Sequence, residues 1–565
     1  MELNAETRSV NEIFSPNKKY IVPRFQREYS WQAEEVEEFW DDVVQQIKLF
    51  PGKKIRNEEY FIGCIVLVGE DSRPEYLIVD GQQRLTTLTI LLRVIVDRLS
   101  ELGESTAAAA LYKNVIEGTD NDGKQYFKLI NESPKPFFQN ELQALSPSRL
   151  KKAETEEEML LLAAFTTLKK KLKEFSIKGL TQVEAARALR DQVLNYLKFI
   201  LVTAKSEDDA YTIFETLNAR GLSLTSVDLI KNWVFKNYNQ IHPNDDAKYV
   251  WGEIRKSITK FSDLETFFRH YWNSKYAFAS DDRLYKSFKD FLKKGVISDA
   301  KEFLLQLRDA SELYRKIGAP SDLDWKVQKE RIIKKSFDLL NQYRVTQVRP
   351  FLLALLECRN KKVIDQSTLI NTVIKLERFH FIFSNLCQDR ASGLEGKYTR
   401  AAKNLHNAGN DKLAAKEVIA DLISYLQKKR PNPQRISDAL NSLSFTHDND
   451  TNKKTIQTIF SKIEISLHAT QELQVGSFSL EHIEDQSGKH GWIGSIGNLI
   501  PLDEDLNNKI KQGSDFKKKK IQYGKSNFKI IDRFIEINPQ DSWGKVGADK
   551  WSSEISLMLD RATEI

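Results

Sequence analysis

Residues 76–96 require a strand, a tight polar turn and a helix in immediate succession. Residues 76–79 are apolar and rich in strand-forming side chains, and residues 88–96 form an apolar helical run. The turn between them, residues 80–84, reads DGQQR. The first backbone N–H groups of a helix lack partners within the helix and attract anions. The segment therefore limits the fold to one in which a strand ends at an anion-attracting helix N-terminus.

The side chains of this turn suit a phosphate group. Arg84 has a planar fork of donors that matches phosphate oxygens, and Asp80 can hold a metal ion or a ribose hydroxyl. The turn lacks the glycine and lysine pattern of a Walker loop. We interpret it as a site for a polyphosphate or a nucleic-acid backbone.

Length and composition indicate a globular protein of several domains. At 565 residues the chain is too long for one core, so we expect two or three domains. The net charge of +6 is small for this length and indicates local basic patches rather than a protein that coats DNA. The 3 cysteines are scattered without a CxxC pair, which argues against a disulfide framework and a cysteine zinc site.

The sequence contains no membrane or secretion signal that we recognise. No apolar run approaches the length of a membrane-spanning helix. The first residues carry acids and no apolar core, unlike a signal peptide. We expect a cytoplasmic protein with no membrane partner.

The hydrophobic pattern predicts an α+β fold that is predominantly helical. Strand signal concentrates in the first 90 residues, and a buried strand is expected at 197–204. A helix over 208–217 should stop at 218–221, and a new helix should start at Thr225 with a capping box to Asp228. Amphipathic helices fill about 240–470, for example 349–359 and 369–386. After about 475 the chain has short strands and glycines and then becomes strongly basic.

A second unusual segment, residues 23–31, combines arginines, a glutamine and aromatics. Arg27 can pair with phosphate, and Phe25, Tyr29 or Trp31 can stack on a base. The ordinary interpretation is that such aromatics pack in a core and such arginines face solvent. The segment alone does not decide between these two interpretations.

Taken together, the N-terminal segments resemble a known family. The order FQR, DGQQR, FETLNARG (residues 214–221) and DLIKN (228–232) is similar to that of the N-terminal domain of the GmrSD family of modification-dependent restriction enzymes. The resemblance covers about residues 10–235 and implies a ParB/sulfiredoxin-like fold that binds and hydrolyses a nucleotide and senses modified DNA. Carried over by position, it implicates Gln26, Arg27, Asp80, Gly81, Gln82, Gln83 and Arg84, with Asn218 and Arg220 as second-rank candidates.

Near the C-terminus, a Glu-His pair precedes two asparagines at spacings that suit a metal-dependent phosphodiesterase. His482 would deprotonate the attacking water, and Asn498 would orient His482 through a hydrogen bond. Glu481 and Asn507 offer oxygens to Mg²⁺ or Mn²⁺. An isolated Glu-His pair would ordinarily be a surface feature.

The order of these residues resembles the ββα-metal (HNH) nuclease motif found at the C-terminus of GmrSD-like proteins, over about residues 435–560. It implies that one strand carries His482, a second strand carries Asn498 and a helix carries Asn507, with Asn508 as an alternative ligand. Asp485 departs from the family, which usually has proline there. His490 is off the pattern, and we expect it at the surface.

A basic run follows the motif. A run of lysines is usually a solvated helix face, but beside a nuclease motif we expect it to contact the DNA backbone, without reading sequence. The expected DNA contacts are Lys509, Lys511, Lys517, Lys518, Lys519 and Lys520.

The resemblance implies a single-chain, type IV phage-defence nuclease. We expect a nucleotide-binding and DNA-sensing domain (1–235), a helical coupling region (236–434) and an HNH-like nuclease domain (435–565). The expected cofactors are Mg²⁺ or Mn²⁺ and an NTP (GTP, UTP or ATP), and the expected partner is modified phage DNA; a homodimer is left open. Two alternatives remain: a nucleotide-gated nuclease for unmodified DNA or RNA, and a non-catalytic DNA-binding regulator with a degenerate nuclease domain.

Overall fold

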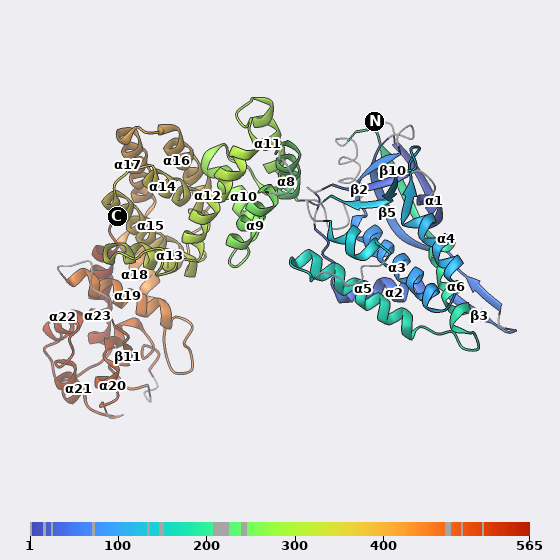
Figure 1. Cartoon of the computed structure of the whole chain (residues 1–565). Coiled ribbons are helices and arrows are strands. Elements are labelled where there is room, and N and C mark those ends of the chain that lie inside the picture. The colour runs from blue at the N-terminus through green and yellow to red at the C-terminus, as the bar shows by residue number, and fades with distance from the viewer. Residues whose placement is uncertain are drawn as a thin grey trace. The chain divides into compact units, whose positions relative to one another are not determined.

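The computed structural model divides the chain into two compact units (Figure 1). One comprises Met1–Tyr249 and Gly295–Leu304, and the other comprises Val250–Lys294 and Leu305–Ile565. The structure describes residues 3–14, 18–23, 26, 28–52, 54–69, 74–132, 136–145, 152–206, 225–238, 246–468, 476–486, 490–510 and 513–565. No helix in the described part of the chain has the length and apolar character needed to traverse a lipid bilayer.

The first unit is built on a mixed six-stranded sheet. Its strand order is β1 (Leu3–Ser9), β10 (Leu197–Ala204), β5 (Tyr60–Val68), β6 (Glu75–Asp80), β2 (Lys19–Val22) and β9 (Leu129–Asn131). The expected strand at 197–204 is confirmed as β10, which runs parallel to β5 and antiparallel to β1. Two short hairpins are formed by β3 (Ile47–Phe50) with β4 (Lys54–Asn57) and by β7 (Glu117–Thr119) with β8 (Gln125–Phe127).

Helix α3 (Gln82–Glu101) lies at the centre of this unit. Every residue from 85 to 96 is buried, as expected for a helix that is apolar on nearly all sides. The helix contacts α4, α5 and α6 as well as β9 (Figure 1). Among the described residues, the α-helices that lie wholly in this unit are α1 (Val10–Ile13), α2 (Ala33–Val44), α3, α4 (Ser105–Val115), α5 (Glu156–Glu174), α6 (Gln182–Asp191) and α8 (Ser226–Asn237).

In its described residues, the second unit is helical except for one small hairpin. The predicted amphipathic helices are present, and the segment predicted at 369–386 is α15 followed by a π-helical turn, Phe381–Leu386. The helices are α10 (Leu264–Lys275), α11 (Leu284–Lys293), α13 (Arg331–Gln342), α14 (Arg349–Asn360), α15 (Gln366–His380), α16 (Leu394–Ala408), α17 (Lys412–Lys429), α18 (Pro433–Asn441), α19 (Lys453–Leu467), α20 (Glu504–Asn507), α21 (Phe516–Tyr523), α22 (Lys529–Ile537) and α23 (Lys545–Ala562). Helices α9 (Asp246–Ile258) and α12 (Ala300–Gly318) have residues in both units.

The hairpin of the second unit pairs β11 (Ser479–His482) with β12 (Leu499–Leu502). Apolar side chains of its two strands pack in a buried cluster that also includes Ile496, Trp551 and Ile555. Helix α23 approaches the turn before β12 so closely that a side chain at Gly497 would overlap the backbone of Ala548. The hairpin is therefore held by apolar packing.

The fold class expected from the sequence, α+β and predominantly helical, is confirmed. The capping box between Thr225 and Asp228 is also confirmed at the start of α8. The short strands β7, β8 and β9 differ from the prediction, which placed strands mainly in the first 90 residues and at 197–204 and expected a largely helical chain elsewhere. Each has 3 residues, too few for a recognisable alternating pattern. The division into three domains stays a prediction.

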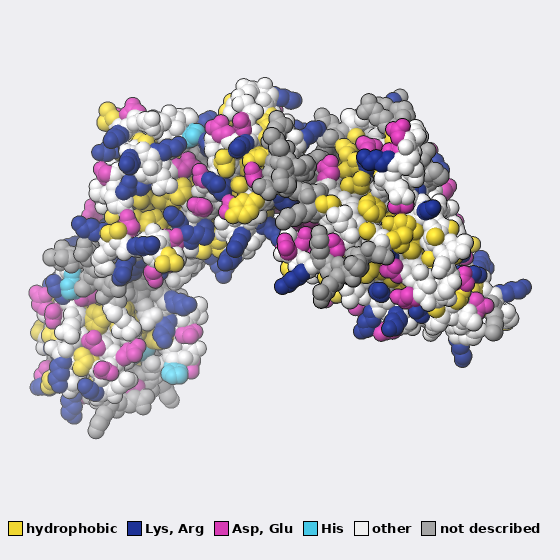
Figure 2. Space-filling view, in the orientation of Figure 1, with side chains coloured by type: hydrophobic (Ala, Val, Ile, Leu, Met, Phe, Trp, Pro, Cys, Tyr) yellow, Lys and Arg dark blue, Asp and Glu magenta, His cyan; other side chains and the backbone are white. Residues whose placement is uncertain are grey.

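Charge is distributed as the small net charge indicates. On the face drawn in Figure 2, lysine and arginine side chains are interspersed with acidic ones over both units. No single basic field dominates that face, so a nucleic-acid site must be sought in local clusters.

Gly81 provides a test of the turn before α3. Its φ of +90° is left-handed, and an added Cβ would lie 3.1 Å from a side-chain carbon of Ile65 and 3.3 Å from the carbonyl oxygen of Cys64. Gly103 has a similar φ of +84° but nothing within 4 Å. Gly103→Ala should lower the free energy of unfolding by about 1–2 kcal/mol. Gly81→Ala should cost at least about 1 kcal/mol more because of crowding. Chemical denaturation measures both, and equal losses would contradict the close approach at Gly81.

Candidate functional site

The DGQQR turn joins β6 to α3 in the first unit. Asp80 is the last residue of β6, Gly81 is the left-handed N-cap, and Gln82 is the first residue of α3. Nη1 of Arg84 donates to the carbonyl oxygen of Cys64 on the neighbouring strand β5 at 2.8 Å. Burial raises the pKa of Asp80, although the Arg84 guanidinium opposes this shift. The turn thus brings a carboxyl, a guanidinium and the first N–H groups of a long helix together.

The two predicted glutamines Gln26 and Gln83 tie the 23–31 segment to this turn. The amide of Gln83 donates to the carbonyl oxygen of Glu28 and accepts from the backbone N–H of Ser30, both at 3.0 Å. Gln26 is buried, and its amide lies 3.4 Å from two carbonyl oxygens of β6. These contacts position the segment and use the polar atoms that the glutamines would need to bind a ligand.

The aromatics of that segment follow the ordinary interpretation. The Tyr29 hydroxyl shares a 2.8 Å hydrogen bond with Thr87 of α3, and burial raises its pKa. Trp31 packs beside Phe39 with ring centroids 6.0 Å apart. Tyr29 therefore belongs to the core, and the partly buried Trp31 packs against that core. Phe25 and the predicted ligands Arg27, Asn218 and Arg220 lie outside the described residues.

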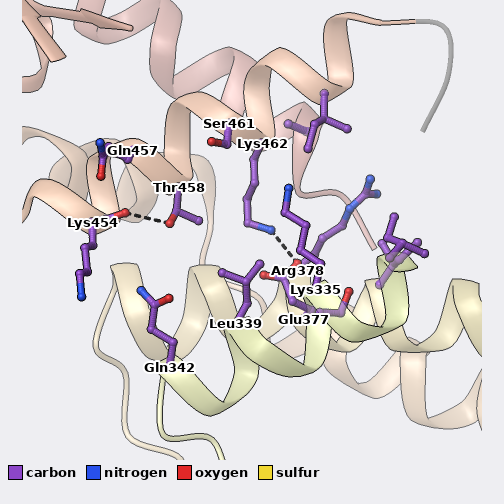
Figure 3. Close-up of a pocket in the computed structure, with 15 residues that line it drawn as sticks. Lys335, Leu339, Gln342, Glu377, Arg378, Lys454, Gln457, Thr458, Ser461 and Lys462 are labelled. Atoms are coloured by element: carbon purple, nitrogen blue, oxygen red, sulfur yellow. Dashed lines mark hydrogen bonds and ion pairs between the residues drawn. The ribbon is translucent and has the colours of Figure 1, made fainter. Parts of the chain in front are cut away.

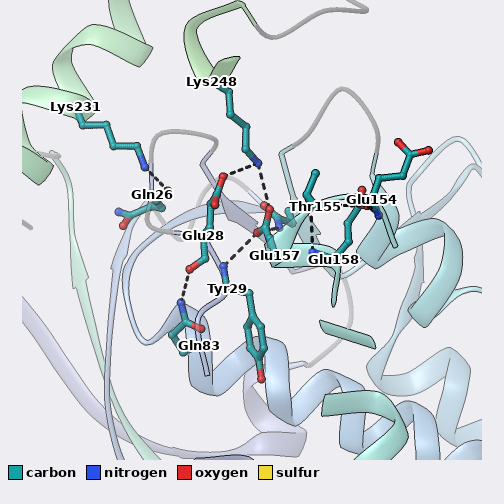
Figure 4. A network of polar contacts seen from close by, with 11 residues as sticks. Gln26, Glu28, Tyr29, Gln83, Glu154, Thr155, Glu157, Glu158, Lys231 and Lys248 are labelled. Carbon is teal, nitrogen blue, oxygen red and sulfur yellow. Dashed lines mark hydrogen bonds and ion pairs between the residues drawn. The ribbon is translucent and has the colours of Figure 1, made fainter. Parts of the chain in front are cut away.

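Two lysines that sequence reasoning did not select approach this region (Figure 4). Nζ of Lys231, on α8, lies 3.5 Å from the carbonyl oxygen of Gln26, and burial lowers its pKa although Glu28 and Asp228 oppose the shift. Lys248, on α9, pairs with Glu28 at 3.1 Å and Glu157 at 3.2 Å. Burial lowers the pKa of Lys248, but the two carboxylates outweigh it and raise the pKa overall.

Lys231 lies in the DLIKN segment, so the motif itself was the signal that would have identified it. Its ammonium is next to the segment that Gln83 holds against the DGQQR turn. A partly desolvated lysine interacts more strongly with an anion than an exposed one does. We add Lys231 to the candidate anion-binding residues.

The second candidate site is centred on His482, at the end of β11. Its Nε2 lies 2.8 Å from the carbonyl oxygen of Phe445 and its Nδ1 lies 3.1 Å from the amide nitrogen of Gln486. Because a carbonyl oxygen only accepts, Nε2 carries the proton and Nδ1 is left as an acceptor. The ring also stacks on Phe445. Burial lowers the pKa of His482, although the Phe445 hydrogen bond and Glu481 oppose the shift. The imidazole is thus held neutral, with a basic nitrogen.

The four hydrogen bonds of the Asn498 side chain go to partners other than His482, contrary to the expectation that it orients this ring through a hydrogen bond. It is fully buried just before β12, in a 3₁₀ turn rather than in a strand. Its amide nitrogen donates to the carbonyl oxygens of Glu484 and Ile493, and its amide oxygen accepts from the backbone of Glu484 and from the Trp543 indole. Asn498 therefore fixes the loop that follows His482, and it orients the ring only through this loop.

Glu481 is already engaged by other side chains. One carboxylate oxygen lies 2.9 Å from Nζ of Lys519 and 3.1 Å from the Tyr523 hydroxyl. Lys519 also donates to the carbonyl oxygen of His482 at 2.8 Å. This corrects the prediction that Lys519 contacts DNA, because its side chain is buried, with 4% exposed.

The expected metal ligands do not form a ready site in this arrangement. A carboxylate that balances a buried ammonium is a poor ligand for a second cation. Among the described residues, no group of three His, Cys, Asp or Glu side chains is placed to hold a metal ion. Asn507 is the last residue of α20, which packs on β11, and Asp485 accepts from the backbone N–H of Gly513 at 2.9 Å. The residues present do not fit a bound metal as they stand.

The remaining lysines are placed at the surface. Lys517 and Lys518 are exposed on α21 and pair with Asp541 and Asp515. Lys520 is half-buried and donates to a carbonyl oxygen at 3.2 Å, and Lys509 is exposed beyond α20. Lys511 lies outside the described residues. Fewer lysines are therefore exposed to contact DNA than the basic run in the sequence indicates.

Two family models match the chain. One, described as the N-terminal domain of the GmrSD restriction endonuclease, matches residues 10–235. The other, described as the C-terminal domain of GmrSD restriction endonucleases, matches residues 432–556. The first includes the DGQQR turn and Lys231, and the second includes His482 and Asn498. No similar sequence is found among curated proteins.

The buried pair of Lys519 and Glu481 generates a stability prediction. Lys519→Met leaves the carboxylate buried without its cation and should lower the free energy of unfolding by about 3–5 kcal/mol. Glu481→Gln in the same chain should restore part of that loss because it removes the unpaired charge. Lys518→Met, with a side chain 75% exposed, is the control and should change it by no more than about 0.5 kcal/mol. Denaturant titration of the three variants would contradict the pair if Lys519→Met and Lys518→Met behaved alike.

Proposed function

The chain belongs to the GmrSD family of restriction endonucleases, and on that basis we propose that it is an NTP-responsive endonuclease that cuts modified phage DNA. The proposed DNA cleavage is supported above all by the tautomer of His482, which its hydrogen bonds fix. The C-terminal part would cleave through this residue, and the DGQQR turn would bind the nucleotide. Sensing of the modification is the part inferred from the family resemblance.

His482 has the properties of a general base. The carbonyl oxygen of Phe445 holds the proton on Nε2, so the lone pair of Nδ1 is directed to the side of Gln486. A lowered pKa keeps the ring unprotonated at neutral pH, which is the state that can accept a proton from water. Movement of the Gln486 amide by one rotamer would open Nδ1 to a water molecule beside a phosphodiester.

An HNH-type reaction also predicts a divalent metal, which would stabilise charge on the leaving oxygen when bound. Glu481 would have to exchange Lys519 for that metal. The same ion pair favours one alternative, a DNA-binding regulator whose nuclease domain has lost its metal site. Cleavage that depends on His482 excludes that alternative.

The nucleotide would bind at the start of α3. Arg84 lies in the first turn of α3, where unpaired N–H groups favour a phosphate, and Lys231 adds a cation beside the 23–31 segment that Gln83 holds against this turn. A nucleotide phosphate there would compete with the carbonyl oxygen of Cys64 for the Arg84 guanidinium. Binding would therefore weaken the hydrogen bond between Arg84 and β5, and so affect the sheet.

The nuclease assignment is tested with His482→Ala on matched phage DNAs, with and without cytosine modification, in Mg²⁺ or Mn²⁺ and mixed NTPs. Wild type should cut the modified DNA, and the variant should lose about 10²–10⁴-fold in rate because its base is gone. His490→Ala, at an exposed histidine stacked on Trp492, is the matched control and should cut normally. The wild-type rate should fall only below about pH 6.5, as His482 becomes protonated.

The outcomes separate the alternatives. Equal cutting of unmodified DNA, or cutting of RNA, would keep the nuclease and discard modification sensing. Cutting that survives in His482→Ala would remove His482 from the reaction.

Nucleotide binding is tested with Arg84→Ala. Loss of a charge-assisted contact to phosphate should weaken NTP binding by at least about tenfold in calorimetry. Arg98→Ala, near the other end of α3, removes the same charge away from the turn and should bind normally. Both variants should keep the wild-type melting profile. Unchanged NTP affinity in Arg84→Ala would contradict a site at the DGQQR turn.

A further inference from the structure

The second unit contains a cavity that takes no part in the two candidate sites described above. It lies between α13, α15 and α19 and has a volume of about 340 Å³ (Figure 3). This volume lies within the range of small-molecule sites, about 300–1,000 Å³. None of the residues proposed to bind a nucleotide or to cut DNA lines it.

Cationic side chains dominate the charge of this cavity. Four cations face one carboxylate, Glu377, so the lining has a net charge of +3 (4 − 1). The cations are Lys335, Arg378, Lys454 and Lys462. They come from all three helices; Lys335, Arg378 and Lys462 gather at one end of the cavity, and Lys454 lies at the other end (Figure 3).

Only part of this charge is balanced within the protein. Glu377 is buried and pairs with Lys462 at 2.6 Å. Arg378 donates to the carbonyl oxygen of Glu564 at 3.0 Å. Within the described residues, the ammonium groups of Lys335 and Lys454 form no hydrogen bond or ion pair.

Lys335 lies in an environment that disfavours its charge. Its side chain is exposed to solvent, yet partial desolvation and the neighbouring Lys462 lower its pKa, and Glu377 opposes them. An anion bound between Lys335 and Lys462 would offset both effects. The cavity therefore favours a ligand with at least one negative charge.

The uncharged residues of the lining indicate the chemistry of the uncharged part of such a ligand. Ile332, Leu339, Ile374 and Ile465 form apolar walls. Gln457, Thr458 and Ser461 of α19 offer donors and acceptors beside them (Figure 3). A small inorganic anion would leave these walls unused, whereas a phosphate linked to an apolar or aromatic body would use both parts.

We propose that this cavity binds a phosphorylated small molecule with an aromatic body, of the class of nucleoside monophosphates. The phosphate contacts Lys335 and Lys462, and the base packs on the isoleucines and Leu339. The site is independent of the DGQQR turn. Because its walls come from the helical segment before residue 430 and from α19 after it, an occupied cavity ties these two parts of the second unit together.

The test is calorimetry on the full chain with AMP, GMP, CMP and UMP in turn, with adenosine as the uncharged probe. At least one nucleotide should bind, and adenosine should bind at least about tenfold more weakly than AMP if AMP is that nucleotide. Lys335→Met should weaken nucleotide binding about tenfold because it removes the unbalanced cation. Lys334→Met is the matched control, since Lys334 lies on the same helix but pairs with Asp338 and Asp322. Its affinity should equal that of wild type.

Two further arms locate the ligand. The titrations are repeated in an Arg84→Ala background, so that loss of the proposed NTP site is not mistaken for loss of this one. Hydrogen exchange should slow in residues 331–342 and 453–467 when the nucleotide is bound. The proposal is overturned if none of the four nucleotides binds, if Lys335→Met binds them as tightly as Lys334→Met does, or if protection appears only around residues 80–101. Weaker duplex DNA binding in Lys335→Met with unchanged nucleotide binding would also overturn it, because the cations would then serve the DNA backbone.

Discussion

The burial of α3 on nearly all sides is the constraint on which the first unit depends. A helix with twelve consecutive buried residues, 85–96, needs a sheet on one side and further helices on the others. Its polar residues are satisfied internally: Thr87 bonds to Tyr29, and Arg93 donates to the carbonyl oxygens of Gln143 and Ala144. Because α3 cannot shift without exposing this surface, its N-terminus is fixed. A phosphate that binds there meets donors that are already oriented, which reduces the entropic cost of binding.

The second unit fixes its candidate catalytic residue differently. His482 lies at the end of a short hairpin, and such a hairpin alone is marginally stable. Buried polar groups compensate, since Asn498 closes the loop after β11 and Lys519 links Glu481 to the backbone of His482. Each of these groups would be costly to bury alone and is stabilising when paired. The site residues are therefore positioned by hydrogen bonds as much as by apolar packing.

Local patterns were predictable from the sequence, and contacts between distant segments were not. The strand–turn–helix at the DGQQR turn, the strand β10 and the cap at Thr225 each depend on neighbours in sequence, and all three are present. The pairing of β1 with β10 joins the start of the chain to residues 197–204, which no local pattern encodes. In the sequence, Lys519 is one of four consecutive lysines, a pattern typical of a solvated helix face. It is buried because α21 packs against β11, where Lys519 contacts Glu481. The role of Asn498 was missed because Trp543, one of its partners, lies 45 residues away.

The contacts of residues 543–551 with the β11–β12 hairpin determine when, during synthesis, this hairpin can be ordered. The Trp543 indole donates to Asn498, the Trp551 indole donates to the carbonyl oxygen of Leu499, and Gly497 lies against Ala548. The loop that holds His482 thus lacks its supports until residues 543–551 have left the ribosome. Until then, the nascent chain carries His482 in a hairpin that lacks these contacts.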